Sequence, residues 1–262
     1  MPPAAYYQRL DAERFQPTEH AQGAWNAHEQ HMAPVSGLLA HALERHAPRP
    51  DLVMARVTYE ILGLIALEPT TVRVRTVRPG RTIELVEAVA SAGGREVVRA
   101  SAWRLAIQET SAVAGGLPRA LPARQRCAPL DATATWSGGY IRSIEVLRAP
   151  ECAPGEGRAW LRTPLALVEG EPSTPLAAFL GLVDTANGMN VRLDPRAWAF
   201  PNLDLSVHLY RTPQGGPGRW IGLDTLVTVG AGGVGLTSTT LHDEAGPVGR
   251  AEQILTVRPV GG

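Results

Sequence analysis

The chain has 262 residues and carries 25 basic and 25 acidic side chains, so its formal net charge at pH 7 is zero. A chain without excess positive charge lacks the field that attracts nucleic acid or anionic lipid, so we expect neither as a partner. Its two cysteines, Cys127 and Cys152, are too few for a disulfide framework. Because no apolar run reaches bilayer length and no signal-peptide pattern is visible, we expect a cytoplasmic globular protein without a membrane span.

The first half of the chain predicts one helix followed by several strands. The segment PVSGLLAHALERH opens with Pro34, which favours the first turn of a helix, and continues with apolar residues at helical spacing. Strands follow in ARVTYEILGLI, TVRVRTVRPG and RTIELVEAVASAGGREVVRASAWRLAIQ. Within TVRVR, Val72 and Val74 alternate with Arg73 and Arg75, as expected when one face of a strand is buried.

A segment without hydrophobic periodicity separates the two halves. Residues 111–130 are rich in alanine, proline, glycine and arginine, a composition that favours a linker over a packed element. We therefore predict an N-terminal unit at residues 1–112, a linker at residues 113–130 that runs over the surface, and a C-terminal unit at residues 131–262.

The second half repeats the order of the first. TPLAAFLGLVDTANG predicts a helix that begins near Pro175 and extends to Asn190, and strands follow in NLDLSVHLYRTP and between Arg219 and Pro259. The turn sequences GAGG and HDEAG separate the later strands. One helix followed by consecutive antiparallel strands, twice in one chain, is typical of the α+β class.

One acidic residue interrupts the apolar stripe of the second predicted helix. The residues that recur at helical spacing and should share a buried face are Leu176, Leu180, Val183 and Asn187. Asp184 falls inside this face. A buried carboxylate is unfavourable unless it is paired or has a function, so Asp184 is the first candidate for a functional residue.

The two halves can be aligned with one another, and three aligned positions differ in polarity. The apolar residue of the first half and the polar residue of the second are Leu43 and Asp184, Met54 and Asn202, and Ala102 and Gln253. If these polar side chains were needed for the fold, both halves would need them. The difference therefore indicates a function that only the second half carries.

Six segments carry the pattern of a known family. In the second half they are STPL at residues 173–176, DTANG at 184–188, FPNLDLSVHLYR at 200–211, WIGLD at 220–224 and LHDEAGPVGRAEQ at 241–253, and in the first half GAWNAHEQHMAPVSGLLAHALER. Together they resemble the TesB-like acyl-CoA thioesterases over nearly the whole chain. The resemblance implies a double hotdog fold, with two antiparallel sheets that each wrap a long central helix. It also implies hydrolysis of an acyl-CoA or acyl-carrier thioester without a cofactor.

The side chains of Asp184, Asn202 and Gln253 suit the activation of water, and the resemblance implies the same catalytic roles. A carboxylate can accept a proton or orient water, while two amides donate and accept hydrogen bonds without titrating. Together they could hold water in line with a thioester carbon. Backbone N–H groups at a helix start would bind the oxyanion. The sequence does not distinguish between the helix starts at Pro34 and Pro175 for this role.

We expect the substrate pocket between the halves, at the contact of the two helices, with an apolar tunnel for the acyl chain. Phe179, Leu180 and Met189 are its predicted wall residues, and His31 is predicted at its mouth. His28 and His31 have a spacing seen in metal sites, but no third ligand follows at a suitable interval, so no metal is predicted. The resemblance also allows a homodimer or a higher homo-oligomer.

Two other functions stay open for the same fold. One is a non-catalytic module that binds acyl thioesters or lipids, because relatives usually have His-Gly-Gly where this chain has HMA at residues 31–33. The other is a hydratase or dehydratase of acyl thioesters, which needs a His–Asp pair near a helix start. The helix with Asp184 contains no histidine, and the acid near His41 is Glu44, so this alternative is weaker.

Overall fold

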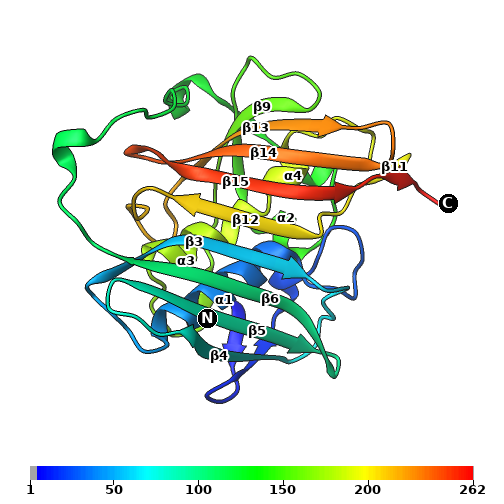
Figure 1. Cartoon of the computed structure of the whole chain (residues 1–262). Helices are drawn as coiled ribbons and strands as arrows, with labels where there is room; N and C mark the ends of the chain where they lie inside the picture. The colour runs from blue at the N-terminus through cyan, green and yellow to red at the C-terminus, as the bar shows by residue number, and fades with distance from the viewer. Residues whose placement is uncertain (1–4, 262) are drawn as a thin grey trace.

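The computed structural model describes residues 5–261, and its main element is a sheet of 14 strands (Figure 1). The strands lie in the order β10-β1-β2-β4-β5-β6-β3-β12-β15-β14-β13-β9-β8-β7. The first half contributes β1 (Ala5–Arg9), β2 (Arg14–Pro17), β3 (Leu52–Ile61), β4 (Thr70–Arg78), β5 (Ile83–Ala92) and β6 (Arg95–Ala106). The second half contributes β7 (Ala128–Leu130), β8 (Glu145–Arg148), β9 (Glu156–Arg162), β10 (Ala166–Val168), β12 (Asp204–Leu209), β13 (Ile221–Val229), β14 (Val234–Asp243) and β15 (Gly246–Thr256). A separate small sheet pairs β11 (Trp198–Ala199) with β16 (Arg258–Pro259).

The helices of the described residues lie on one side of this sheet. They are α1 (Met32–Arg45), α2 (Gly139–Arg142), α3 (Pro175–Val183) and α4 (Ala186–Met189), and short 3-10 turns occur at Glu19–Ala21, Ser111–Val113, Arg124–Arg126 and Ala132–Ala134. α1 and α3 pack against each other behind the sheet in the view of Figure 1. Leu38 of α1 and Leu180 of α3 are fully buried there. None of the described helices is long and apolar enough to cross a membrane.

The prediction of two separate sheets is wrong, because the sheets of the two halves join. β3 and β12 pair antiparallel, with Val57 opposite Val207. Near one edge, β1 pairs in parallel with β10 of the second half, with Ala5 opposite Ala166. The hydrogen-bonded edge that each unit would expose by itself is therefore used to bind the other unit, and one sheet runs through both halves.

The crossing of α1 and α3 brings the two helix backbones into contact. A Cβ atom at Gly37 would lie 2.9 Å from the Cα of Gly181, closer than side-chain atoms pack. Beside this contact, the Ser36 hydroxyl donates a hydrogen bond to the Leu180 carbonyl at 2.7 Å. The two backbones therefore leave no room for a side chain at this crossing, and the acyl tunnel along the helix contact stays a prediction.

The second predicted helix is interrupted at Asp184. α3 ends at Val183, whereas we predicted one helix from Pro175 to Asn190. At the break the Thr185 N–H donates to the Leu182 carbonyl at 3.2 Å, an i→i+3 bond that tightens the last turn. Asp184 thus becomes the C-terminal cap of α3, and α4 begins two residues later at Ala186.

The segment that joins the halves runs along the outside of the sheet (green in Figure 1). Most of residues 113–127 are exposed, and the Pro122 carbonyl accepts a hydrogen bond from the Trp160 indole at 2.9 Å. The last three residues of the predicted linker form β7, which pairs with β8 of the second half. The boundaries of the two units at residues 112 and 131 stay a prediction. The pairing of β7 with β8 associates β7 with the second unit.

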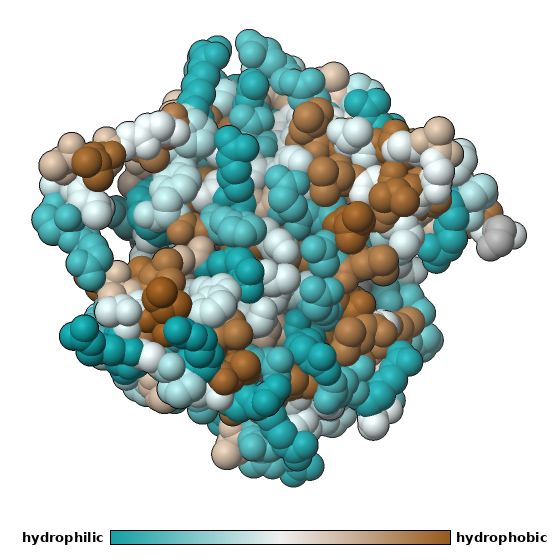
Figure 2. Space-filling model, in the orientation of Figure 1, coloured by the Kyte–Doolittle hydropathy of each residue, from teal (hydrophilic) through white to brown (hydrophobic). Residues whose placement is uncertain are grey.

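The face of the sheet that points away from the helices carries some apolar side chains. Leu236 on β14 and Ile254 on β15 are direct cross-strand partners, and both are exposed. Figure 2 shows apolar atoms toward the right of this face, among hydrophilic ones. The buried side chains of β15 alternate with the exposed ones, as its sequence pattern predicts, and the buried set includes Gln253.

Candidate active site

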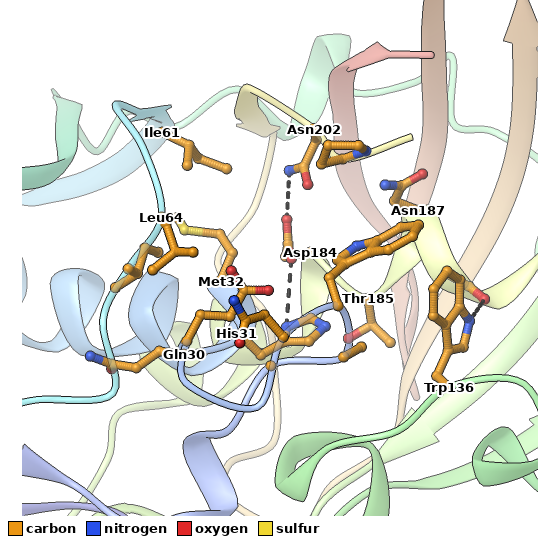
Figure 3. Close-up of a pocket in the computed structure, with 18 of the residues that line it drawn as sticks. Gln30, His31, Met32, Ile61, Leu64, Trp136, Asp184, Thr185, Asn187 and Asn202 are labelled. Atoms are coloured by element: carbon orange, nitrogen blue, oxygen red, sulfur yellow. Dashed lines mark hydrogen bonds and ion pairs between the residues drawn. The ribbon is translucent and has the colours of Figure 1, made fainter. Parts of the chain in front are cut away.

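A cavity of about 420 Å³ lies where α1 begins and α3 ends (Figure 3). Its lining comes from segments far apart in sequence, within residues 23–32, 61–65, 184–189 and 199–203, together with Trp136, Ile141 and Arg258. Apolar side chains such as Ile61, Leu64 and Met189 form much of the wall. Asp184 also lines this cavity, and Arg258 is the one arginine among its described lining residues.

Asp184 is held by two amide side chains. Its Oδ1 atom accepts a hydrogen bond from Asn202 Nδ2 at 2.8 Å and another from Gln253 Nε2 at 3.0 Å. The Asp184 residue is 5% exposed, and Figure 3 shows the side chain of Asn202 pointing at its carboxylate. The three polar residues from the comparison of the halves therefore meet at one point.

Burial makes the Asp184 carboxyl a weaker acid than usual. Removal from water raises its pKa from 3.8 to about 6, against the opposing effect of the hydrogen bonds from Asn202 and Gln253. The group is thus ionised at neutral pH but holds a proton more readily than an exposed aspartate. These are the properties expected of a general base that works near pH 7.

Neighbouring strands and α4 place the two amides. Gln253 lies on β15 between β12 and β14 and is 1% exposed. Asn202 precedes β12 and forms an isolated bridge with Leu255 of β15. Asn187 of α4 donates to the Phe200 carbonyl at 3.0 Å, which ties α4 to the segment that carries Asn202. The arrangement therefore rests on ordered backbone and not on a free loop.

His31 lies directly beside Asp184, at the start of α1 (Figure 3). Its Nδ1 atom accepts a hydrogen bond from the Ala33 N–H at 3.1 Å, so His31 is the N-terminal cap of the helix. The same atom is 3.7 Å from Asp184 Oδ2. Burial lowers the pKa of His31 from 6.5 to about 3, so the imidazole is neutral.

The sequence did not indicate two further groups around the cavity. Thr185 lines it, and its hydroxyl oxygen lies 2.5 Å from that of Tyr140, which is fully buried. Trp25, Trp136 and Phe200 form a cluster of edge-to-face rings, with Trp25 4.9 Å from Trp136 and 5.3 Å from Phe200 between ring centroids. Aromatic residues make up only 5% of the chain. The presence of Trp25 and Trp136 outside the predicted strands was therefore the feature of the sequence that could have indicated this cluster.

Only two of the four predicted substrate-binding residues line the cavity that contains Asp184. His31 and Met189 line the cavity that contains Asp184. Phe179 lines a different hollow, of about 30 Å³, on the far side of α3. Leu180 is fully buried beside the helix crossing and lines neither. The cavity lies beyond the C-terminal end of α3, so residues in the middle of that helix do not reach it.

The other histidines that we considered lie apart from this cavity. His28 is exposed, and residues 5–261 contain no cluster of three metal-ligating side chains. His41 is hydrogen-bonded to Glu171 at 3.1 Å. The cavity nevertheless contains a neighbouring His–Asp pair, His31 and Asp184, which we did not predict because the two residues come from different halves.

Comparisons with known proteins agree with this fold. Residues 21–105 match the family model of the acyl-CoA thioesterase N-terminal domain, and residues 124–257 match that of the C-terminal domain. No protein with a curated description matches the chain. The two family matches together cover most of the chain, in the order of the two halves.

Solved structures of low sequence identity share the architecture. A hot-dog-fold protein of Alicyclobacillus acidocaldarius has 16% identity and a TM-score of 0.75, covering 97% of this chain and 96% of that one. The acyl-CoA thioesterase II TesB2 of Mycobacterium marinum has 16% identity and a TM-score of 0.66, covering 98% and 96%. The TesB protein of Mycobacterium avium subspecies paratuberculosis has 17% identity and a TM-score of 0.64, covering 97% and 96%. The chain therefore has the hotdog fold, and by its two domain matches it is a thioesterase that belongs to the acyl-CoA thioesterase family.

Proposed function

We propose that the protein hydrolyses acyl thioesters by activating a water molecule at Asp184. The observation that carries the proposal is the different surroundings of the two carboxylate oxygens. Oδ1 accepts hydrogen bonds from Asn202 and Gln253, whereas no described residue donates one to Oδ2. His31 Nδ1, at 3.7 Å, is beyond hydrogen-bonding distance of Oδ2. Oδ2 is thus free to accept a proton from water in the cavity.

In the proposed reaction, Asp184 acts as the general base. Water transfers a proton to Oδ2 while its oxygen bonds to the thioester carbon, and a tetrahedral oxyanion forms. The oxyanion then collapses, the C–S bond breaks, and the thiolate leaves with the proton returned from Asp184. The products are a carboxylic acid and a thiol. General-base catalysis of this kind contributes about 10² to 10⁴-fold to the rate.

Of the two helix starts that stayed open for the oxyanion, the start of α1 is the better candidate. Met32, its first residue, lines the cavity together with Asp184. The first N–H groups of a helix have no partner within the helix and carry partial positive charge. The start of α3 has its cap Thr174 hydrogen-bonded to Glu44 near the opposite end of α1. We therefore assign the Met32 N–H to the oxyanion.

The shape and charge of the cavity support an acyl-CoA or acyl-carrier substrate. The apolar wall suits an acyl group, and Arg258 at the edge of the cavity is exposed, with its guanidinium beside the Thr256 hydroxyl and no acidic partner among the described residues. Both coenzyme A and the prosthetic arm of carrier proteins bear phosphate, which a guanidinium binds well. We also interpret the two halves as two hotdog units that share one sheet.

A dehydratase is the second candidate, because His31 and Asp184 lie close together. In such an enzyme the histidine would remove a proton from carbon. His31 suits this role poorly, since burial lowers its pKa to about 3 and its Nδ1 already accepts the Ala33 N–H. A base that binds protons so weakly is unable to deprotonate carbon at a useful rate. Hydrolysis therefore fits the site better.

An assay of thiol release with acyl-CoAs of increasing chain length tests the proposal, with Asp184→Asn as the variant. We expect kcat to fall about 10² to 10⁴-fold while the fold is retained. Glu44→Gln is the matched control, because burial also raises the pKa of Glu44 but this residue lies beside Thr174, away from the cavity. The control should keep full activity.

Two outcomes would contradict the proposal. Unchanged hydrolysis by Asp184→Asn would exclude Asp184 as the base. If the wild-type protein released thiol neither from acyl-CoA nor from an acylated carrier protein, yet bound them, the non-catalytic binding module would be the better description.

A further inference from the structure

We propose that His31 is a catalytic residue that donates a hydrogen bond from Nε2 to the carbonyl oxygen of the bound thioester. The inference rests on the proposed hydrolysis, and it adds a side-chain donor to the backbone N–H of Met32. The sequence predicted His31 only as a residue at the mouth of the pocket. The inference gives His31 a specific role, which is to bind the negative charge that develops on the carbonyl oxygen.

The hydrogen bond at the helix start fixes the tautomer of the imidazole. A backbone N–H can only donate, so the bond from Ala33 N–H requires an unprotonated Nδ1 on His31. A neutral imidazole then carries its single proton on Nε2. Within residues 5–261, Nε2 of His31 has no hydrogen-bond partner, although the side chain lines the cavity and keeps 15% of its surface exposed. The free donor is therefore available to a ligand.

The surroundings keep His31 neutral instead of pairing it with Asp184. The groups that face the ring are Asp184, Tyr140 and the start of α1. Asp184 accepts its hydrogen bonds from Asn202 and Gln253, and burial holds the pKa of His31 far below neutral pH. A neutral donor does not neutralise the carboxylate that activates water. One cavity can thus contain both a base and an electrophilic donor.

Packing also fixes the direction of the N–H. The His31 ring lies against the ring of Tyr140, with centroids 4.2 Å apart and an angle of 30° between the planes. Tyr140 is itself fully buried and contacts the hydroxyl of Thr185. The imidazole is therefore held at Nδ1 by the helix and on its face by Tyr140. A donor held in place before the reaction loses little free energy to reorganisation when charge develops.

His31→Asn separates the donor from the helix cap. Asparagine Oδ1 can occupy the place of His31 Nδ1 and accept the Ala33 N–H, and asparagine is among the best N-cap residues. No atom of asparagine reaches the position of Nε2. We expect the variant to fold as the wild type does and to lose roughly 10²-fold or more in kcat, as other proteins do when they lose an oxyanion donor. The loss should be the same across the pH range, because His31 is neutral throughout.

A spectroscopic measurement tests the contact directly. The probe is a ketone analogue of acyl-CoA, in which CH₂ replaces the sulphur and the carbonyl carbon is labelled with ¹³C. Its infrared carbonyl stretch should move to lower frequency when it binds the wild-type protein, and this shift should be reduced in His31→Asn. Denaturation of both proteins in urea verifies that the cap is retained.

The outcomes separate this inference from the proposed function. Unchanged kcat and an unchanged carbonyl frequency in His31→Asn would overturn the role of His31, even if Asp184→Asn abolished hydrolysis. If the wild type hydrolysed no thioester, the carbonyl shift of the analogue would still decide whether His31 binds it. Failure of the analogue to bind either protein would also count against the inference.

Discussion

Each half of the molecule packs a helix against its strands, α1 in the first half and α3 in the second, but the two helices end in different surroundings. In the second half, Asp184 follows α3 and meets Asn202 and Gln253 at an open cavity. In the first half, Leu43 and its aligned partners are buried and apolar. The difference shows that one architecture can support a polar site at one helix end and a closed core at the other.

A buried ion pair closes the first half. The Arg104 guanidinium donates to the carbonyls of Leu43 and His46 at the end of α1, and to Glu84 at 2.9 Å. Arg104 is aligned with Leu255 of the second half, which carries no charge there. The last carbonyls of α1 are therefore bound by an internal cation, whereas α3 ends at a carboxylate. A cation at the C-terminus of a helix is also favoured by the helix dipole.

The largest effect on stability should come from removing the buried ion pair of the first half. Arg104→Ala removes one partner of a buried pair and the two hydrogen bonds to the Leu43 and His46 carbonyls at the end of α1, so we expect a loss of about 3 to 5 kcal/mol in the free energy of unfolding. Urea denaturation measures it. Arg99→Ala, on the same strand but paired with Glu96 at the surface, is the control and should cost less than about 1 kcal/mol. Equal losses in both variants would mean that the buried pair does not stabilise the first half.

Removing the charge of the buried Asp184 carboxyl should stabilise the protein at neutral pH. The pKa of Asp184 is raised from 3.8 to about 6, so folding favours the protonated form. Below pH 4 the carboxyl is protonated in both states, and the unfavourable contribution grows as the pH rises and is complete above pH 6. Asp184→Asn should therefore be about 3 kcal/mol more stable than wild type at pH 8 and equal to it near pH 4.

Urea denaturation over this pH range measures that difference. A constant difference between pH 4 and pH 8 would show that the carboxyl is not strained by burial. The Glu171 carboxyl serves as an internal contrast, because Arg9 holds the pKa of Glu171 at about 2, and a Glu171→Gln variant should lose stability instead of gaining it.

Replacing one amide with an apolar side chain of similar size should shift the pH dependence of activity. Asn202→Leu removes a hydrogen bond that lowers the pKa of Asp184, so that pKa should rise further. The acidic limb of the kcat profile, which requires an ionised Asp184, should move upward by about one pH unit, or 1.4 kcal/mol. Ser206→Ala, on the next strand, is a control that should leave the limb in place. An unshifted limb in Asn202→Leu would separate Asn202 from the base.

The smallest effect is expected at the edge of the cavity. Arg258 is aligned with Ile107 of the first half, so the charge is present in only one half. Arg258→Gln should raise KM for acyl-CoA by roughly two- to five-fold, since exposed ion pairs contribute less than about 1 kcal/mol. An acyl-pantetheine substrate, which lacks phosphate, should show no change, and Arg250→Gln is the control for a loss of surface charge. A similar rise with both substrates would exclude a phosphate contact.

Much of the fold was predictable because its signals are local. The alternating sequence of β15 puts Gln253 on the same face as Ala251 and Leu255, and all three residues are buried. The alignment of the halves identified Asp184, Asn202 and Gln253 as candidate functional residues without any knowledge of the distances between them. Periodicity and internal comparison were sufficient here because each residue has a partner position in the other half.

Other features depend on contacts that local patterns do not encode. The helical spacing of the predicted buried face continues from Val183 to Asn187, so the sequence pattern shows no break where α3 ends at Val183. The close approach of α1 and α3 at Gly37 is another such contact, because a single glycine in a helical pattern does not reveal it. The proximity of His31 to Asp184 likewise follows from the packing of two halves.

The shared sheet affects how the chain must be made. Ala5 pairs with Ala166, and β3 pairs with β12, so well over half of the protein must leave the ribosome before these strands find their partners. Until then, the first half exposes unpaired strand edges, which are templates for association with other chains. Pairing across such long sequence separations is also slow. A nascent first half is therefore the species of this protein most in need of protection from aggregation.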